Sequence, residues 1–393
     1  ITFDYLNWQK EKLAGRQKAG GTSQTFSLTG WIDKNLIEPL KKELGRETNN
    51  FVAEELPIRK DEAVPVIFKN KLFKDYESIT TLYGTPQRHE PDPTPFLAPF
   101  FTLFFGMAMT DAGYGIIMAG GIYAAIKILK IPRAKQKLLR VLMYGGAATF
   151  ILGALTGGWF SIDLEILPAG IAGVLKAIQI IDPIKSPLII FYLALALGVL
   201  QVLFGLGIDT YWKIKDKQII PALTGSGAWF ITILFGLLYA GGSMGAIPEI
   251  VGGIAKYLMF LGIILIIYGG TIGKNILLKP AFGTLALYNA VGYFSDILSY
   301  SRLLALGLTT TIIGTVVNII AGLVYGLPFI GWLAALAILI GGHTFNLAIN
   351  ALGAFIHSAR LQFIEFFPKF LEAGGIPFEP FKKEAKYVRL TKV

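Results

Sequence analysis

The distribution of apolar residues divides the chain near residue 95. Before that point, charged residues alternate with short apolar runs, and after it come long apolar blocks. A hydrocarbon core of about 30 Å needs about 20 apolar residues per helix. The blocks cover residues 96–129, 138–158, 186–212, 219–241, 247–273, 284–325 and 329–368. This pattern predicts an all-α polytopic membrane domain over residues 96–370.

The first apolar block is too long for one crossing. It spans 34 residues and holds Asp111, Gly113 and Gly115 at its centre. A single helix would bury the Asp111 carboxylate in mid-membrane, where a charge is costly. Asp and Gly favour turns, so we predict a hairpin of two short crossings and eight transmembrane helices in all. Both a helix cap and a role in transport stay open for Asp111.

The positions of lysine and arginine support this hairpin. They cluster in four segments, residues 127–140, 213–217, 274–279 and 382–392. The loops near 159–185, 242–246 and 326–328 hold only Lys176 and Lys185. Cytoplasmic loops carry an excess of Lys and Arg, so we expect both termini in the cytoplasm of a multi-pass cell-membrane protein. Residues 162–182 are expected to form an outer loop or surface helix.

The last two blocks are unusually long. Each has about 40 residues, or roughly 60 Å of helix at 1.5 Å per residue. A helix perpendicular to the membrane needs half of that, so we predict two long, strongly tilted helices. Pro328 is expected at the outer turn between them.

The residues before the membrane domain predict a soluble structure. Residues 4–19 and 37–47 have helical patterns, the second closed by Gly45, whereas residues 26–32 and 65–70 have strand patterns. We expect residues 1–95 to be the end of a small α/β cytoplasmic domain and residues 371–393 to be a cytoplasmic tail. Because the sequence begins with Ile rather than Met, we expect a longer natural chain.

Composition excludes several classes of function. The 393 residues are 53% hydrophobic and 16% charged, against about 45–50% and about 25% in soluble domains. The net charge of +10 lies in short runs between apolar blocks, which favours membrane topology over nucleic-acid binding. With no cysteine and three histidines, no metal is expected. Residues 269–275 lack the spacing of a phosphate-binding loop, so we expect no cofactor, no nucleotide site and a non-catalytic chain.

A first polar constellation interrupts an apolar block at Ser295, Asp296, Ser299 and Arg302. An intramembrane arginine is a functional hypothesis by default. The spacing places Ser295, Ser299 and Arg302 on one helix face. The alternative is a structural salt bridge to Asp296, which lies six residues away, about 600° around the helix, and therefore on a different face.

A second constellation lies in the last block. It comprises His343, Asn346, Asn350, His357, Arg360 and Glu365. Four of these residues form a polar stripe, namely Asn346, Asn350, His357 and Arg360. The stripe either lines a transport path or holds the helices together through interhelical hydrogen bonds, and both interpretations stay open.

Three segments carry a family resemblance. They are DPTPFLAPFFTLFFGMAMTDAGYGI (92–116), SDILSYSRLLALGLTT (295–310) and NALGAFIHSARLQFIEFFPKF (350–370). Together they resemble the membrane half of subunit I, also called subunit a, of V-type and A-type rotary ATPases, in a prokaryotic form. Residues 29–44 and 79–95 resemble the end of that family's cytoplasmic domain.

This resemblance implies a stator that lies against a ring of proteolipid subunits, each with one intramembrane carboxylate. It implies that Arg302 is the essential arginine of ion translocation and Arg360 the second one. We expect the half-channels to be lined by Ser295, Asp296, Ser299, Asn346, Asn350, His357, Glu365 and Asp111. Further implied partners are the central-stalk cap subunit, the peripheral-stalk subunits and membrane lipid, with no nucleic acid.

The sequence also departs from the eukaryotic pattern of the family. Thr310, Tyr288 and Asn350 stand where eukaryotic members carry a histidine and two glutamates, which leaves the transported ion, H⁺ or Na⁺, open. A secondary transporter with its own midplane site is the alternative function, although the inverted repeats common in such proteins are not evident. A structural scaffold would leave two midplane arginines without a purpose.

Overall fold

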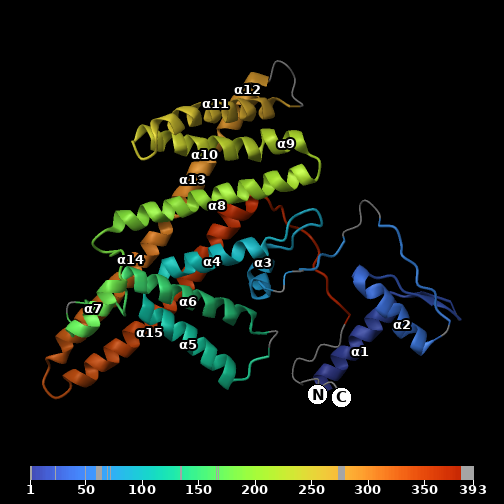
Figure 1. The fold of residues 1–393 in the computed structure, drawn as a ribbon. Helices are drawn as coiled ribbons and strands as arrows, with labels where there is room; N and C mark the ends of the chain where they lie inside the picture. The colour runs from blue at the N-terminus through green and yellow to red at the C-terminus, as the bar shows by residue number, and fades with distance from the viewer. Residues whose placement is uncertain are drawn as a thin grey trace. The chain divides into compact units, whose positions relative to one another are not determined.

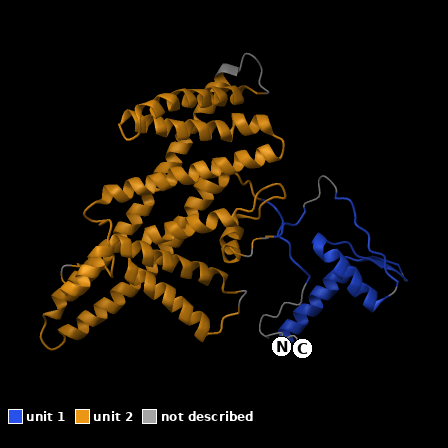
Figure 2. Ribbon diagram, viewed as in Figure 1, with its two compact units in different colours: residues 1–67, 374–393 blue, residues 68–373 orange. Residues whose placement is uncertain are grey.

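The structure is a computed structural model with two compact units. It describes residues 2–22, 24–48, 50–58, 64–68, 70, 72–132, 135–164, 166, 168–272 and 279–381. One unit comprises residues 1–67 and 374–393, and the other comprises residues 68–373 (Figure 2). The basic residues expected in the tail, together with Arg133 and Lys274, lie outside the described residues.

The first unit is small and mostly helical. Its elements are α1 (Thr2–Gln17), β1 (Gly20–Gly21), β2 (Phe26–Ser27), η1 (Lys34–Leu36) and α2 (Ile37–Glu47). The helix predicted over 37–47 is confirmed, although it continues past Gly45 to its end at Glu47.

The strands predicted in this unit are much shorter than expected. Only two residue pairs join β1 to β2, Gly20 with Ser27 and Gly21 with Phe26. The described residues of the segment 65–70 contribute only the bridge between Val66 and Pro377. The residues after Ser27 are exposed, so water can satisfy their backbone groups and no ladder is needed to do so.

The second unit is a bundle of helices (Figure 1). Its elements are η2 (Lys74–Tyr76), α3 (Glu77–Tyr83), α4 (Thr94–Met109), α5 (Ala112–Ile128), α6 (Lys137–Thr156), α7 (Ala169–Ile178), α8 (Pro187–Lys215), α9 (Ile219–Thr224), α10 (Ser226–Ser243), α11 (Glu249–Thr271), α12 (Lys279–Leu287), α13 (Asn289–Ser299), α14 (Ser301–Tyr325), α15 (Gly331–Arg360), η5 (Leu361–Phe366) and η6 (Phe367–Lys369). The helix α7 lies in the segment predicted as an outer loop or surface helix, and its side chains are mostly exposed.

Six helical segments in the described part of the chain are long and apolar enough to cross a membrane. They are Lys137–Thr156, Pro187–Lys215, Ile219–Ser243, Glu249–Thr271, Ala281–Tyr325 and Gly331–Lys369. The last two have 45 and 39 residues, which agrees with the two long helices predicted from the sequence. Their tilt in a membrane stays a prediction.

The first apolar block forms two helices rather than one. The chain breaks between α4 and α5, where Thr110 adopts a left-handed conformation and Asp111 caps α5. The two helices have 16 and 17 residues, or about 25 Å each, which is shorter than a usual crossing. The break is therefore confirmed, and the total of eight crossings remains a prediction.

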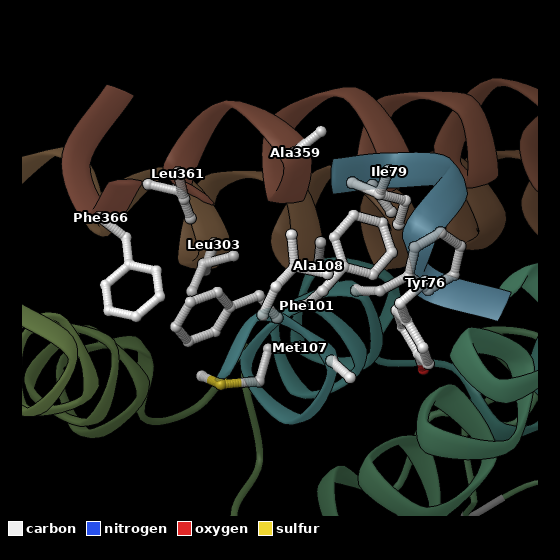
Figure 3. Close-up of a cluster of buried hydrophobic side chains, with 14 of the residues drawn as sticks. Tyr76, Ile79, Phe101, Met107, Ala108, Leu303, Ala359, Leu361 and Phe366 are labelled. Carbon is white, nitrogen blue, oxygen red and sulfur yellow. The ribbon is translucent and has the colours of Figure 1, made fainter. Parts of the chain in front are cut away.

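The core of the second unit surrounds α4. Phe101 lies 5.7 Å from Phe355 of α15, and Phe104 lies 5.5 Å from Tyr300, both measured between ring centroids. Phe101, Leu303 and Phe366 are fully buried in this cluster (Figure 3). Such edge-to-face aromatic pairs are favourable beyond their buried area, so α4 fixes the start of α14 against the end of α15.

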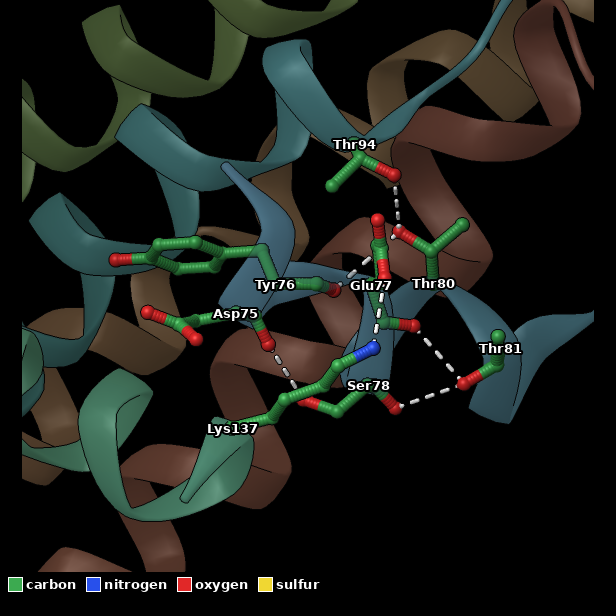
Figure 4. A network of polar contacts seen from close by, with 8 residues as sticks. All are labelled: Asp75, Tyr76, Glu77, Ser78, Thr80, Thr81, Thr94 and Lys137. Atoms are coloured by element: carbon green, nitrogen blue, oxygen red, sulfur yellow. Dashed lines mark hydrogen bonds and ion pairs between the residues drawn. The ribbon is translucent and has the colours of Figure 1, made fainter. Parts of the chain in front are cut away.

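A polar network joins η2 and α3 to α4 and α6 (Figure 4). Lys137 forms a 2.7 Å ion pair with Glu77, and the hydroxyls of Thr80 and Thr94 lie 3.1 Å apart. Burial raises the pKa of Tyr76 to about 12, so its hydroxyl stays protonated and hydrogen-bonds to Thr102. These contacts anchor the segment that precedes the membrane helices.

Candidate functional site

Arg302 lies in the first turn of α14, two residues after the buried Tyr300. The hydroxyl of Tyr300 donates a 2.6 Å hydrogen bond to the Gln201 side chain of α8. A Cβ added to Gly198 would lie 2.6 Å from the Tyr300 ring, so the glycine makes room for it. Tyr300 thus fixes the junction of α13 and α14. The side chain of Arg302, which follows this junction, is half-buried.

The guanidinium of Arg302 lies among several charged side chains whose proximity was not predicted from the sequence. It interacts electrostatically with Glu365 and with Arg360. His357 interacts with the same two arginines, and the Ser299 hydroxyl faces the Glu365 carboxylate. The structure therefore unites residues from both polar constellations at one site.

Several polar atoms of Arg302 and of residues 357–365 are buried without a hydrogen-bond partner among the described residues. They are Arg302 Nη1, His357 Nδ1, Ser358 Oγ, Gln362 Nε2 and Glu365 Oε2. Such atoms are rare in folded proteins and each needs an explanation. Their concentration gives the site unused donors and acceptors for water, an ion or a partner's side chain.

A π-helical turn brings Glu365 to this site. After Arg360 the helix widens over Leu361–Phe366, and the Phe367 N–H bonds the Gln362 carbonyl, five residues back. Glu365 and Gln362 are both buried there. Single π turns occur often at functional sites. Face assignments based on 3.6 residues per turn do not continue through this segment, so the sequence could not place Glu365.

Gln201 and Gln362 were missed by sequence reasoning. The Gln201 amide donates a 2.7 Å hydrogen bond to Gln362 Oε1, and both side chains are fully buried. Buried amides need such partners. The available signal was a polar residue at Gln201, within an apolar block.

The structural salt bridge considered between Asp296 and Arg302 does not form. Asp296 instead pairs with Lys369 of η6 at 2.5 Å. Ser295 is exposed, and its carbonyl accepts a 3.1 Å hydrogen bond from the Ser299 hydroxyl. The sequence did not single out Lys369, because it lies in the aromatic run that ends the last block.

Asp111 acts as a clamp on two segments. Its carboxylate accepts hydrogen bonds from the backbone N–H of Tyr114 at 3.1 Å, of Phe160 at 3.0 Å and of Ser161 at 3.0 Å. It therefore caps α5 and also fixes the loop after α6. Of the two roles left open by the sequence, this geometry is that of a cap.

The two asparagines belong to a network that joins α5, α14 and α15. Asn346 donates to the Tyr114 hydroxyl at 2.9 Å and to the Thr310 carbonyl at 3.0 Å. Asn350 donates to the Asn346 carbonyl at 2.8 Å. The structure thus gives these residues the interhelical hydrogen bonds of one of the two interpretations.

His343 completes this network. Its Nε2 lies 3.0 Å from Asn318 Oδ1, and its Nδ1 lies 2.6 Å from the Tyr114 hydroxyl. The Asn318 amide nitrogen donates to the carbonyl oxygens of Phe160 and Ser161, so its oxygen must face His343. A neutral His343 with its proton on Nε2 satisfies every partner.

Arg360 lies at the exposed end of an apolar stripe. It follows Ile349, Leu352 and Ile356 on one face of α15, and these three side chains are 48–61% exposed. The residues repeat every three or four positions, which keeps them on one face. In the described part of the chain, no group of three or more His, Asp or Glu side chains suits a metal ion.

Comparison with known proteins tests the resemblance carried by the motifs. No family model matches the chain. It is 31% identical to A-type ATP synthase subunit I of Methanocaldococcus jannaschii, over 98% of this chain and 59% of that protein. The counterpart in Pyrococcus abyssi is 35% identical over 92% of this chain and 54% of that protein.

A bacterial relative extends the comparison. V-type ATP synthase subunit I of Chlamydia trachomatis is 25% identical over 92% of this chain and 62% of that protein. The chain thus spans between half and two thirds of the length of these three relatives. The resemblance is confirmed: over nearly its whole length, this chain is homologous to the subunit I proteins of A-type and V-type ATP synthases.

Proposed function

We propose that this chain is the ion-translocating membrane part of the stator in a rotary ATPase. Residues 96–370 form the membrane domain, residues 1–95 the end of a cytoplasmic domain and residues 371–393 a cytoplasmic tail. The domain works against a proteolipid ring and couples H⁺ or Na⁺ movement to ring rotation. The cytoplasmic part contacts the central-stalk cap and peripheral-stalk subunits.

One observation carries this proposal. The guanidinium of Arg302 is partly exposed, and its buried Nη1 nitrogen has no hydrogen-bond partner among the described residues. An arginine in an apolar segment needs a compensating partner. The exposed apolar face that leads to Arg360 is consistent with a neighbouring membrane subunit there. In this proposal, a ring carboxylate supplies an acceptor for the unused Nη1 donor of Arg302.

The mechanism follows from the chemistry of arginine. A guanidinium does not release its proton in proteins, so Arg302 attracts an anion and carries no proton itself. The attraction is stronger in the low-dielectric contact between this chain and the ring than in water. A ring carboxylate that reaches Arg302 is favoured in its charged form and releases its ion. The fixed charge also blocks a direct leak between the two half-channels.

The polar residues divide between two half-channels in this proposal. One is lined by Ser295, Ser299, His357 and Glu365, around Arg302. Asp296, expected from the sequence as a further lining residue, is held in its ion pair with Lys369 and borders this half-channel without meeting the ion. The other is lined by Asp111, Asn346 and Asn350, whose hydrogen bonds to α5 and α14 keep its wall rigid.

The proposed topology is tested by labelling. The sequence has no cysteine, so a single Lys135→Cys substitution gives one reporter in the basic loop between α5 and α6. We expect a membrane-impermeant thiol reagent to reach it only from the cytoplasmic side. A Gly245→Cys variant, in the loop between α10 and α11, is the matched control and should react only from outside. Reaction of position 135 from outside would contradict eight crossings.

Reconstitution separates the stator from the alternative, a secondary transporter. A transporter moves solute by itself, whereas a stator needs its ring. We expect vesicles that contain only the subunit to show no ion uptake under an imposed gradient, and vesicles with the assembled complex to take up ions when ATP is added. Uptake by the subunit alone would favour a secondary transporter.

A further inference from the structure

The two long helical segments carry an unequal set of charges near the site. Asp296 and Glu365 are the two acidic groups, and Arg302, Arg360 and Lys369 are the three basic ones. Asp296 pairs with Lys369, although 73 residues separate them in sequence. Glu365 interacts with Arg302. Each carboxylate thus has a different principal cation.

Lys369 is held in place by more than its ion pair. Its Nζ lies 2.5 Å from Asp296 Oδ2 and 4.3 Å from the centroid of the Tyr293 ring. Tyr293 and Asp296 are three residues apart on α13, so they present one face to the ammonium group. Cation–π contact adds to the ion pair when the cation is partly desolvated.

The Lys369–Asp296 pair is shielded from water. The Lys369 side chain is 15% exposed and the Asp296 side chain 21% exposed. Phe370, which follows Lys369, and Phe367, two residues before it, are buried in the core. This anchoring fixes the position of η6, and removal of one partner from such a pair leaves an uncompensated charge.

Without Lys369, Asp296 would act on the same charges as Glu365. The Glu365 carboxylate already interacts electrostatically with Asp296, Arg302 and Arg360. A freed Asp296 carboxylate would therefore raise the negative potential around Arg302. Two carboxylates would then compete with any anion that approaches the guanidinium.

We propose that Lys369 is a positioning residue, which holds Asp296 so that the charge of Arg302 remains available to an incoming carboxylate. This inference rests on the proposed function, and it assigns to Lys369 a role that acts through Asp296 and Arg302. Lys369 itself does not meet the translocated ion. Its loss should impair ion movement through the freed carboxylate rather than through loss of packing.

The test uses the assembled complex in vesicles. Lys369→Gln should lower ATP-driven ion uptake by about tenfold or more, because it leaves Asp296 unpaired in a partly buried site. The double variant Asp296→Asn with Lys369→Gln removes the competing charge as well. We expect it to recover uptake to within about threefold of the parent, since coupled residues give non-additive effects.

Lys137→Gln is the matched control, because it breaks another close Lys–carboxylate pair, the 2.7 Å pair with Glu77 between α6 and α3. Uptake by that variant should stay near the parent value. Subunit content and ATP hydrolysis are measured for every complex. Full uptake by the Lys369→Gln complex would overturn the proposal.

Equal loss of uptake in the single and double variants would also overturn it, because the proposal attributes the loss to the unpaired Asp296 carboxylate, which the double variant removes. A purely structural pair would instead lower the subunit content of the Lys369→Gln complex and restore it in the double variant, and that result would overturn the proposal as well. An Arg302→Gln complex is measured in parallel, so that a failure of the proposed function can be distinguished from a failure of this inference alone. If that complex pumps, the proposed function fails. If it does not pump while Lys369→Gln pumps normally, only this inference fails.

Discussion

Replacement of Arg302 by Gln is expected to abolish ATP-driven ion uptake in the assembled complex. Hydrogen bonds to charged groups are worth about 1.5–3 kcal/mol each, so the loss of two such bonds should lower uptake by at least a factor of about one hundred. Lys keeps the charge but loses the planar fork, and Arg302→Lys should abolish uptake as well. Ion uptake into vesicles is the measurement.

Assembly should survive these substitutions, because Arg302 makes no hydrogen bond through its buried Nη1 nitrogen. Subunit content of the purified complex is therefore checked in parallel. Arg360→Lys is the comparison. It should reduce uptake less, since Arg360 is exposed at the end of α15 and, in the proposed mechanism, supports the contact with the ring rather than meeting the carboxylate first. Normal uptake by the Arg302→Gln complex would end the proposed mechanism, and loss of assembly would point to a structural role.

Replacement of Gly153 by Ala is expected to destabilise the membrane domain strongly. A Cβ at this position would lie 2.2 Å from the Ala112 nitrogen and 2.5 Å from the Asp111 carbonyl carbon. Both atoms are backbone, so the overlap can be relieved only by moving α5 away from α6. Overpacking typically costs about 1–3 kcal/mol, and occasionally more, and this shift would also loosen the hydrogen bonds of Asp111.

Gly120→Ala is the matched control for Gly153→Ala. Gly120 lies on α5, and nothing lies within 4 Å of a Cβ added there. In a helix, Ala is favoured over Gly by about 1 kcal/mol, so this variant should be as stable as the parent or more so. The thermal midpoint of the purified protein and its yield in membranes are measured. Equal stability of the two variants would show that the close approach of α5 and α6 is not required.

The sequence predicted the helical membrane domain because its apolar blocks are long and the signal is strong. The break of the first block at Asp111 was also predictable, since a carboxylate is costly inside an apolar helix and since Asp and Gly favour turns. The extent of the strands at 26–32 and 65–70 was not predictable. Short apolar runs fit a strand or an exposed loop equally well, and only the presence of a partner strand distinguishes them.

The residues of the candidate site also fall into two groups, those that the sequence identified and those that only the structure revealed. Arg302 and Arg360 were recognisable by themselves, because a permanent charge in an apolar block is costly wherever it lies. Their neighbours were not, because a π-helical turn shifts Glu365, and because Lys369 reaches Asp296 across 73 residues of sequence.

The sequence by itself determined which residues are apolar enough for a membrane and which charges stand out among them. Only the tertiary structure decided which carboxylate pairs with which cation, and that Asp111, His343 and Asn346 join helices. The physical reason is the difference in sequence separation over which these interactions act. Hydropathy and turn preference act along a few residues of chain, whereas ion pairs and hydrogen bonds depend on distances of about 3 Å between segments that only the fold brings together.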